Sequence, residues 1–391
     1  MRKPNPAVPL EAAHAAWRTD GAQSDRHAWQ TLSCKLVTPL YGGGVRAGEI
    51  DETMPIRPSG IRGQLRFWWR LLYGTNGQPA DVFEAETAIW GGITRGGPKA
   101  SKVAVRVKAN EVHSSDLAAK SQLVGFPAYA LIIEPGGDPR LLCKGYGFDL
   151  ALRFASDLDA ERRAQAEQAL RWWASFGGVG ARTRRGLGAV KVEGLEPVTR
   201  AEVAERGGRL ILRTSGGDAA NAWTSAVEAL QRFRQGQNMG RNPGPGRSRW
   251  PEADTLRLQT KRHALKHAPE HTVKGVYPRA AFGLPIVFHF KDAGDPHDQM
   301  LVPDGSDRMA SPLILRPYWN GQQWQPAALL VPGWERRLSV RVGFGHGGYQ
   351  PAWPNDDPTQ ARTLAEQIQP MQGRGTDPLS AFMDYFEKGR P

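Results

Sequence analysis

The chain has 391 residues and a net charge of +12, so it is too long for one ordinary core and favours a polyanionic partner. Its two cysteines, Cys34 and Cys143, offer neither a disulfide framework nor a zinc cluster, which indicates a reducing compartment. The first 30 residues lack the apolar core of a signal peptide, and no later stretch has the apolar length needed to cross a bilayer. We therefore expect a cytoplasmic protein of two domains.

Residues 1–28 are weakly periodic and predict an arm or a short appended helix. The rest of the first half predicts a strand, a helix, further strands and a second long helix. The expected strands are 29–37, 103–107, 128–133 and 147–154, and the expected helices are 61–73, 83–90 and 159–175. This order is compatible with an α+β sandwich of the ferredoxin or RRM type.

The helix over 61–73 follows the entry PIRPSG and has two different sides. With about 100° between successive residues, Trp68 falls on an apolar side, whereas Trp69 falls on the opposite side together with three arginines. Guanidinium groups suit phosphate and flat rings suit bases. Taken alone, such a helix is more often explained by solvated arginines and buried tryptophans, and whether Trp69 stacks on a base or packs in the core stays open.

A glycine-rich loop follows the second long helix, over 176–190. It contains four glycines and three arginines: Gly178, Gly180, Gly186, Gly188, Arg182, Arg184 and Arg185. Its backbone N–H groups could bind one phosphate while the arginine side chains bind the neighbouring phosphates. It lacks the Gly-Lys-Ser/Thr ending of a nucleotide P-loop. Composition leaves a plain basic hairpin equally open, and we favour polyanion binding because this is the second arginine-bearing element of the same half.

The second half repeats the types of element without a strict sequence repeat. We place the first domain at 29–195 and the second at 196–391, because a proline and mixed charges interrupt the pattern near 193–206. The second domain predicts strands at 209–214, 282–290, 312–317, 327–331 and 339–342, and helices at 219–234, 255–266 and 378–386. A Gly/Pro/Arg loop lies between them at 235–251.

Several sequence blocks, in order along the chain, resemble the RAMP superfamily of CRISPR-associated proteins, and more narrowly the family of subunit one of the type III-B (Cmr) effector complex. The blocks are TPL followed by three glycines at 38–44, PIRPSGIRGQLRFWWR at 55–70, GVG at 178–180, RGLG at 185–188, GRSRWPE at 246–252, RAAFGLPI at 279–286 and RMASPL at 308–313. The block at 55–70 is highly specific, whereas the glycine loop alone identifies only the superfamily.

The resemblance implies two tandem ferredoxin-like (RRM-like) RAMP domains with a glycine-rich loop and long insertions. It also implies a non-catalytic RNA-binding subunit near the 3′ end of the CRISPR RNA, which helps to capture target RNA in antiviral defence. Its partners would be the CRISPR RNA, single-stranded target RNA and other Cmr-type RAMP subunits. No cofactor, metal or membrane is expected.

Under this hypothesis the basic residues contact phosphate, with sequence selection left to pairing with the guide. The candidate RNA-binding residues are Arg57, Arg62, Arg66, Trp69, Arg70, Arg182, Arg184, Arg185, Arg247, Arg249, Lys274 and Arg279.

Two alternatives remain. A RAMP endoribonuclease could use a single histidine as general base, for which His27 and His113 are the candidates. A general polyanion-binding structural protein outside any CRISPR system is the other. The trio His263, His267 and His271 has helical spacing, but Pro269 interrupts it, so we do not expect a metal site there.

Overall fold

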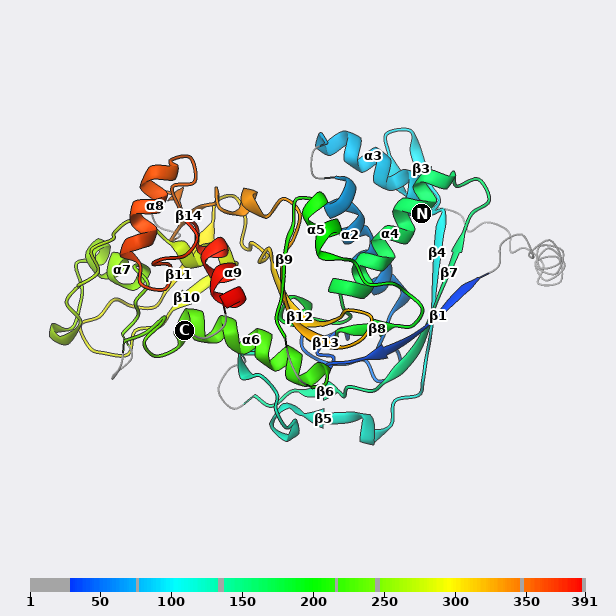
Figure 1. Ribbon diagram of the computed structural model, residues 1–391, viewed down its shortest axis with the longest axis horizontal. Helices are drawn as coiled ribbons and strands as arrows, with labels where there is room; N and C mark the ends of the chain where they lie inside the picture. The colour runs from blue at the N-terminus through cyan, green and yellow to red at the C-terminus, as the bar shows by residue number, and fades with distance from the viewer. Residues whose placement is uncertain are drawn as a thin grey trace, which may run out of the picture.

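The computed structural model describes residues 29–74, 77–132, 137–214, 217–242, 247–344 and 348–388. It is a mixed α+β protein with several antiparallel sheets. In Figure 1 the elements of the first half lie on the right and the C-terminal elements on the left. The predicted arm at 1–28 lies outside the described residues. Within the described part of the chain, no helix is both long and apolar enough to span a membrane.

The first sheet has four antiparallel strands in the order β4-β7-β1-β8, and two helices cover one of its faces. Its strands are β1 (Gln30–Leu36), β4 (Val103–Ala109), β7 (Gly147–Phe154) and β8 (Val190–Val192). Helix α2 (Pro58–Tyr73) follows β1, and α4 (Ala160–Phe176) follows β7. Alternate side chains, such as Leu36 and Leu150, point under these helices and are buried, as expected for a strand with one covered face. Along the chain the order is therefore strand, helix, strand, strand, helix, strand.

The insertions of the first half contain short elements. These are α3 (Pro79–Trp90), β2 (Gly92–Thr94), β3 (Gly97–Lys99), β5 (Leu117–Ala119) and β6 (Arg140–Leu142). The strand predicted from residue 128 is wrong for its described part: Ala128–Ala130 form a 3-10 turn in which Tyr129 and Ala130 are buried. An apolar run of this length does not by itself distinguish a strand from another buried segment.

A second sheet, in the order β12-β13-β9, lies between α4 and helix α6 (Ala219–Gln235). Its strands are β9 (Arg209–Leu212), β12 (Leu313–Trp319) and β13 (Trp324–Leu330), and α5 (Arg200–Glu205) precedes β9. Along β12, Ile314 and Tyr318 join the core of the first half, and the Tyr318 ring stacks on Phe176 of α4 at 5.7 Å. Leu313 and Leu315 join the core that contains α6. Both faces of this sheet are thus covered (Figure 1).

A small third core lies among α7 (Glu252–Thr260), β10 (Ile286–Phe288), β11 (Gln299–Pro303), β14 (Arg341–Gly343) and β15 (Gln350–Pro351). The last two helices, α8 (Pro358–Gln367) and α9 (Pro378–Lys388), pack instead into the core that contains α6. Two predicted elements are shorter than expected. The strand predicted at 282–290 is only β10, because Pro285 has no N–H for a ladder. The helix predicted at 255–266 ends at Thr260, since Lys261 takes a left-handed conformation.

Candidate nucleic-acid interface

The arginines in the middle of α2 bind a carboxylate of the same protein. Arg66 Nε and Arg70 Nη1 lie 2.6 and 2.7 Å from Glu86 Oε1 on α3. The Glu86 side chain is only 5% exposed, and a charge in such a place needs close partners. These two arginines therefore hold α3 against α2. An RNA phosphate would compete with Glu86 for them, so their use as RNA ligands stays a prediction.

The entry and first turn of α2 use their arginines in a similar way. Arg57 Nη2 lies 2.7 Å from Asp51 Oδ2, which fastens the preceding loop to the helix. Arg62 donates to the carbonyl of Trp90 at the end of α3. Burial, and then the neighbouring Arg66, lower the pKa of Arg62 below its usual value. Neither Arg57 nor Arg62 points freely to solvent, and their role in binding RNA also stays a prediction.

Trp69 packs in the core, so the expectation that it could stack on a base is corrected. Only 2% of this residue is exposed, and its ring lies against Tyr73. Its Nε1 donates to Gln165 Oε1 of α4 at 3.0 Å. The helical angle placed Trp69 beside the arginines, but it could not show that α4 covers this side as well.

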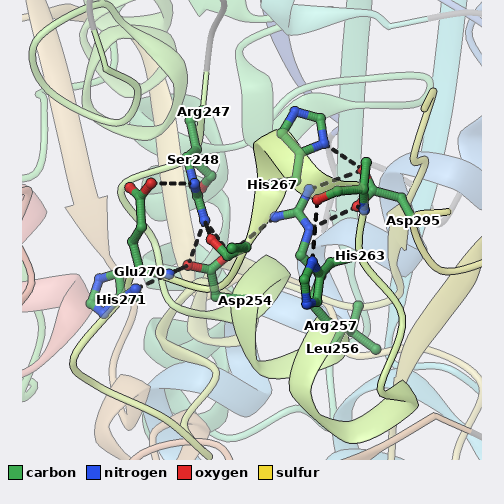
Figure 2. Close-up of polar contacts among 12 residues, drawn as sticks. Arg247, Ser248, Asp254, Leu256, Arg257, His263, His267, Glu270, His271 and Asp295 are labelled. Atoms are coloured by element: carbon green, nitrogen blue, oxygen red, sulfur yellow. Dashed lines mark hydrogen bonds and ion pairs between the residues drawn. The ribbon is translucent and has the colours of Figure 1, made fainter. Parts of the chain in front are cut away.

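The arginine network of the second half is structural (Figure 2). Arg247 lies 3.2 Å from Asp254 Oδ1 and 2.7 Å from Glu270 Oε1. The buried Asp254 also contacts Arg257 at 3.0 Å and accepts the backbone N–H groups of Glu270 and His271. Arg247 therefore helps to fix the 262–275 segment on α7.

The other three candidates of the second half differ in whether a group of the protein already binds their charged side chain. Arg279 Nε lies 3.0 Å from Glu252 Oε2, and that carboxylate is completely buried. Arg249 Nε donates to Asn242 Oδ1 at 2.7 Å. Lys274 is exposed, and no described side chain pairs with it. Only Lys274 therefore has a charge that is available to a ligand without a competing partner.

The four glycines of the glycine-rich loop allow the chain to pass close to other backbone. A Cβ on Gly188 would lie 1.9 Å from Val179 O, and a Cβ on Gly186 would lie 2.5 Å from the ring of Trp223 on α6. Both residues have positive φ, at +62° and +78°. Gly178 and Gly180 approach backbone carbonyls in a similar way. Gly186 is thus required where the loop packs on β12 and α6, and the other three where the loop packs on itself or on Leu40 and Tyr41.

Many N–H groups of this loop bond to the protein, which leaves fewer for phosphate than the sequence suggested. Those of Val179, Ala181, Arg185, Gly186 and Gly188 donate to backbone carbonyls, and that of Ala189 donates to Thr38 Oγ1. The contribution of the loop to a ligand therefore lies mainly in its side chains.

The three loop arginines have no carboxylate partner among the described residues. Arg182 is exposed. Arg184 donates to the Ser311 carbonyl and lies over the Phe67 ring at 5.4 Å. Arg185 has a buried Nη1 with no hydrogen-bond partner. Because this nitrogen is itself inaccessible, Arg185 contributes positive charge to the loop rather than a direct contact to a ligand.

Two further arginines, which the sequence did not single out, join this group. Burial, and then the positive charge of Arg337, lower the pKa of Arg184 to about 10. Burial also lowers the pKa of Arg185 to about 10, opposed by Tyr129 and reinforced by Arg234 and the other loop arginines. We call Arg182, Arg184, Arg185, Arg234 and Arg337 the junction arginines. They come from the loop, α6 and the turn after β13, and no local motif connects them.

The junction arginines form a concentration of positive charge that is not neutralised within the described chain. Like charges this close repel one another, and a bound polyanion would relieve that repulsion. By contrast, Arg57, Arg66, Arg70, Arg247 and Arg279 are ion-paired. The structure thus separates the ion-paired candidates from the loop arginines, whereas Arg62 and Arg249 bind neutral acceptors and Lys274 has no described partner.

The histidine candidates lie in ordinary surroundings where they are described. His27 lies outside the described residues. His113 is exposed, and its backbone N–H donates to Asp116 Oδ2. Of the trio considered for a metal site, His267 instead lies beside Asp292 and Asp295, with ligand atoms within 4.8 Å of one another. Arg257 and Lys266 already neutralise these two carboxylates.

Acid should weaken the α7 region because two of its carboxyl pKa values are low. Burial opposes ionisation of Asp254 and Asp295, but hydrogen bonds and arginines outweigh it and lower both pKa values, that of Asp295 to about 2. A carboxyl whose pKa is lower in the folded than in the unfolded chain stabilises the fold above about pH 4 and loses this effect as the pH falls toward 2. Urea unfolding at several pH values should show this loss. In Asp295→Asn it should be smaller; an unchanged dependence would contradict the assignment.

The described molecule is thus an α+β protein with unpaired basic groups where its two halves meet. Residues 33–191, from β1 to β8, match the family model of the RAMP superfamily. The match covers less than half of the chain and confirms the sequence resemblance at the level of the superfamily. No curated protein matches the sequence.

Several solved structures are similar over long stretches but at low identity. Cmr1 from Pyrococcus furiosus in its apo form is 14% identical, with a TM-score of 0.45, over 83% of this chain and 90% of that chain. A chain of type III-B Cmr-beta bound to cognate target RNA and AMPPnP is 10% identical, with a TM-score of 0.40, over 93% and 99%. A chain of a type IV-B CRISPR complex is 15% identical, with a TM-score of 0.31, over 46% and 97%.

Proposed function

We propose that the protein is a non-catalytic RNA-binding subunit of a type III-B CRISPR–Cas effector (Cmr) complex. In this proposal it lies near the 3′ end of the CRISPR RNA and helps to capture target RNA, with other Cmr-type RAMP subunits as partners. The RAMP match over 33–191 and the ordered sequence blocks that resemble subunit one support it.

We also propose that both halves are ferredoxin-like. The order β4-β7-β1-β8, with α2 and α4 on one face, supports this for the first half. For the second half, β12-β13-β9 with α6 after β9 supplies three strands in the corresponding order. Among the described residues of that sheet there is no fourth strand.

The single observation that carries RNA binding is the group of junction arginines. Their guanidinium groups are not matched by carboxylates, although lysine and arginine side chains form 21 ion pairs elsewhere in the described chain. Arginine forks bind phosphate oxygens in two places at once, so such a group suits a nucleic-acid backbone. Phosphate contacts of this kind give affinity with little sequence preference, which leaves recognition to guide pairing.

The variant Arg182→Gln/Arg337→Gln should bind single-stranded RNA more weakly than the native protein. Both side chains are exposed, so the fold should survive. Loss of two phosphate contacts should reduce the slope of log affinity against log salt by about 1.4. Fluorescence anisotropy with labelled RNA at several salt concentrations measures both effects.

The matched control is Arg200→Gln/Arg362→Gln, which removes the same charge from two exposed helix positions that have no partner in the described structure. If the two variants weaken binding equally, the effect comes from net charge, and the junction arginines are not a site.

Catalysis by a single histidine is the competing function, and it can be tested directly. The purified protein, incubated without metal with a labelled CRISPR repeat RNA, should leave the RNA intact. Specific cleavage that disappears in His27→Ala or His113→Ala would replace our proposal with an endoribonuclease. Purification of the native complex should recover RAMP subunits and a discrete guide RNA; their absence would favour a general polyanion-binding protein.

A further inference from the structure

The first sheet has an outer face on the side opposite α2 and α4 (Figure 1), and this face carries positive charge. Side chains alternate along each strand, so the residues between the buried ones point to this face. Its basic residues are Lys35 on β1, Arg106 and Lys108 on β4, Arg153 on β7 and Lys191 on β8. All except the half-buried Lys191 are exposed. We call these five residues the sheet-face cations.

Strand register places these charges side by side. Lys35 lies directly opposite Lys191 across β1 and β8, a like-charge pair that is unfavourable in an isolated sheet. Arg106 lies opposite Ala151. Two carboxylates lie near these cations: Asp149 is directly opposite Lys108 but forms no ion pair within 4 Å, and Glu193, just after β8, lies 3.1 Å from Lys191 Nζ. The cations without an ion pair are therefore Lys35, Arg106, Lys108 and Arg153, on β1, β4 and β7.

Aromatic rings lie among the sheet-face cations. The guanidinium carbons of Arg106 and Arg153 lie 4.4 and 5.1 Å from the ring centre of Trp29, just before β1. Lys191 Nζ lies 4.7 Å from the ring centre of Trp319, which itself contacts Trp324. Trp29 is only half-buried. Cations that follow a backbone, with rings on which bases can stack, are the combination by which proteins hold single-stranded nucleic acid.

We propose that the outer face of the first sheet is a second binding surface for single-stranded RNA, separate from the junction arginines. This inference rests on the proposed RNA-binding function and adds to it a path for the strand across β4, β7, β1 and β8. Phosphates would contact the sheet-face cations, and bases would stack near Trp29. Neither contact reads a base edge, so binding here is tolerant of sequence.

Charge complementarity selects RNA over the protein's own N-terminal segment as the occupant. Residues 1–28 contain four basic residues (Arg2, Lys3, Arg18 and Arg26) and three acidic ones (Glu11, Asp20 and Asp25). A segment with a slight positive excess cannot neutralise the four cations that lack an ion pair, whereas an RNA strand supplies one negative charge at each nucleotide.

The test uses the full chain with Lys35→Gln, Arg106→Gln and Lys108→Gln combined. These side chains are exposed and have no ion-pair partner in the described structure, so the variant should fold. The probe is a labelled uridine oligonucleotide of about 16 nucleotides. We expect affinity at physiological salt to fall by about tenfold or more, and the salt slope to decrease by about 2. The control, Arg200→Gln/Arg362→Gln/Lys388→Gln, removes the same charge elsewhere and should change affinity much less.

The outcomes separate this inference from the proposed function. If Arg182→Gln/Arg337→Gln weakens binding and the sheet-face variant behaves like its control, the sheet face is overturned while the junction site stands. If only the sheet-face variant weakens binding, the sheet face is supported and the junction site is overturned. If the native chain does not bind the probe, both fail.

Crosslinking provides an independent readout of position. Ultraviolet crosslinking of the native chain to a 4-thiouridine oligonucleotide should label the tryptic peptide 27–35, which contains Trp29. Label confined to peptides of the glycine-rich loop, α6 and residues 334–337 would overturn the inference. So would a sheet-face variant that has no effect in the full chain but weakens binding once residues 1–28 are deleted, because the N-terminal segment would then be the occupant.

Discussion

Gly188→Ala should lower the free energy of unfolding by about 3 kcal/mol or more. Gly188 has φ +62°, where an L-residue is strained, and a Cβ would lie 1.9 Å from Val179 O. That oxygen belongs to the backbone and cannot rotate away. The carbonyl of Gly188 also accepts the N–H of Val179, so a shift would disrupt this bond. Urea unfolding followed by circular dichroism measures the loss.

The matched control is Gly194→Ala. Gly194 has φ +76°, but a Cβ there would meet no atom within 4 Å. The substitution should therefore cost only the backbone strain, about 1–2 kcal/mol. Equal losses in the two variants would mean that the close approach at Gly188 is not what makes glycine necessary in this loop.

Arg316→Met should destabilise the protein by about 3–5 kcal/mol. Arg316 on β12 is 2% exposed, and its guanidinium group donates to the carbonyls of Pro317, Gly177 and Val190. Methionine fills similar space but donates no hydrogen bond, so three buried carbonyls lose their partner. Two of these belong to the first half of the chain. The substitution should therefore weaken the packing of β12 against the first half of the chain.

Thermal and urea unfolding of Arg316→Met can be compared with those of Arg341→Met. Arg341 also lies on a strand, but it is more than half exposed and its ion pair with Asp304 is on the surface. Such surface pairs contribute about 0–1 kcal/mol. If the two substitutions cost the same, the bonds of Arg316 to Gly177 and Val190 do not stabilise the junction.

Periodicity predicted the elements that dominate the fold. The helices at 61–73, 159–175, 219–234 and 378–386 correspond to α2, α4, α6 and α9, and the strands at 29–37, 103–107 and 147–154 correspond to β1, β4 and β7. These elements have one buried face, so their apolar residues recur at regular spacing. The segment near 128 failed because a short apolar run does not distinguish a strand from another buried segment, and the one near 282 because Pro285 keeps the ladder from extending over its first half.

The site was predictable in part. The sequence identified the glycine-rich loop and its arginines because glycine and arginine have distinctive local chemistry. It could not identify which arginines are neutralised, because their partners are distant in the chain: Glu86 for Arg66, and Glu252 for Arg279. The sequence did not identify Arg234 and Arg337 either, because they are distant in the chain from the glycine-rich loop that they approach in the fold. The alternation of charge in β4 was visible, but its place on the same sheet face as Lys35, with β7 between them, and near Trp29 follows only from the fold.

The position of the second sheet between α4 and α6 has a consequence for modularity. Ile314 and Tyr318 complete the apolar core of the first half, and Leu187 of the first half completes the core around α6. A chain cut after residue 195 would expose Phe176 and its neighbours on α4 to water, where apolar surface promotes association. The two halves that the sequence suggests are therefore not interchangeable folding modules. Evolution can lengthen the surface insertions of such a protein freely, but it must change the two halves together wherever they share a core.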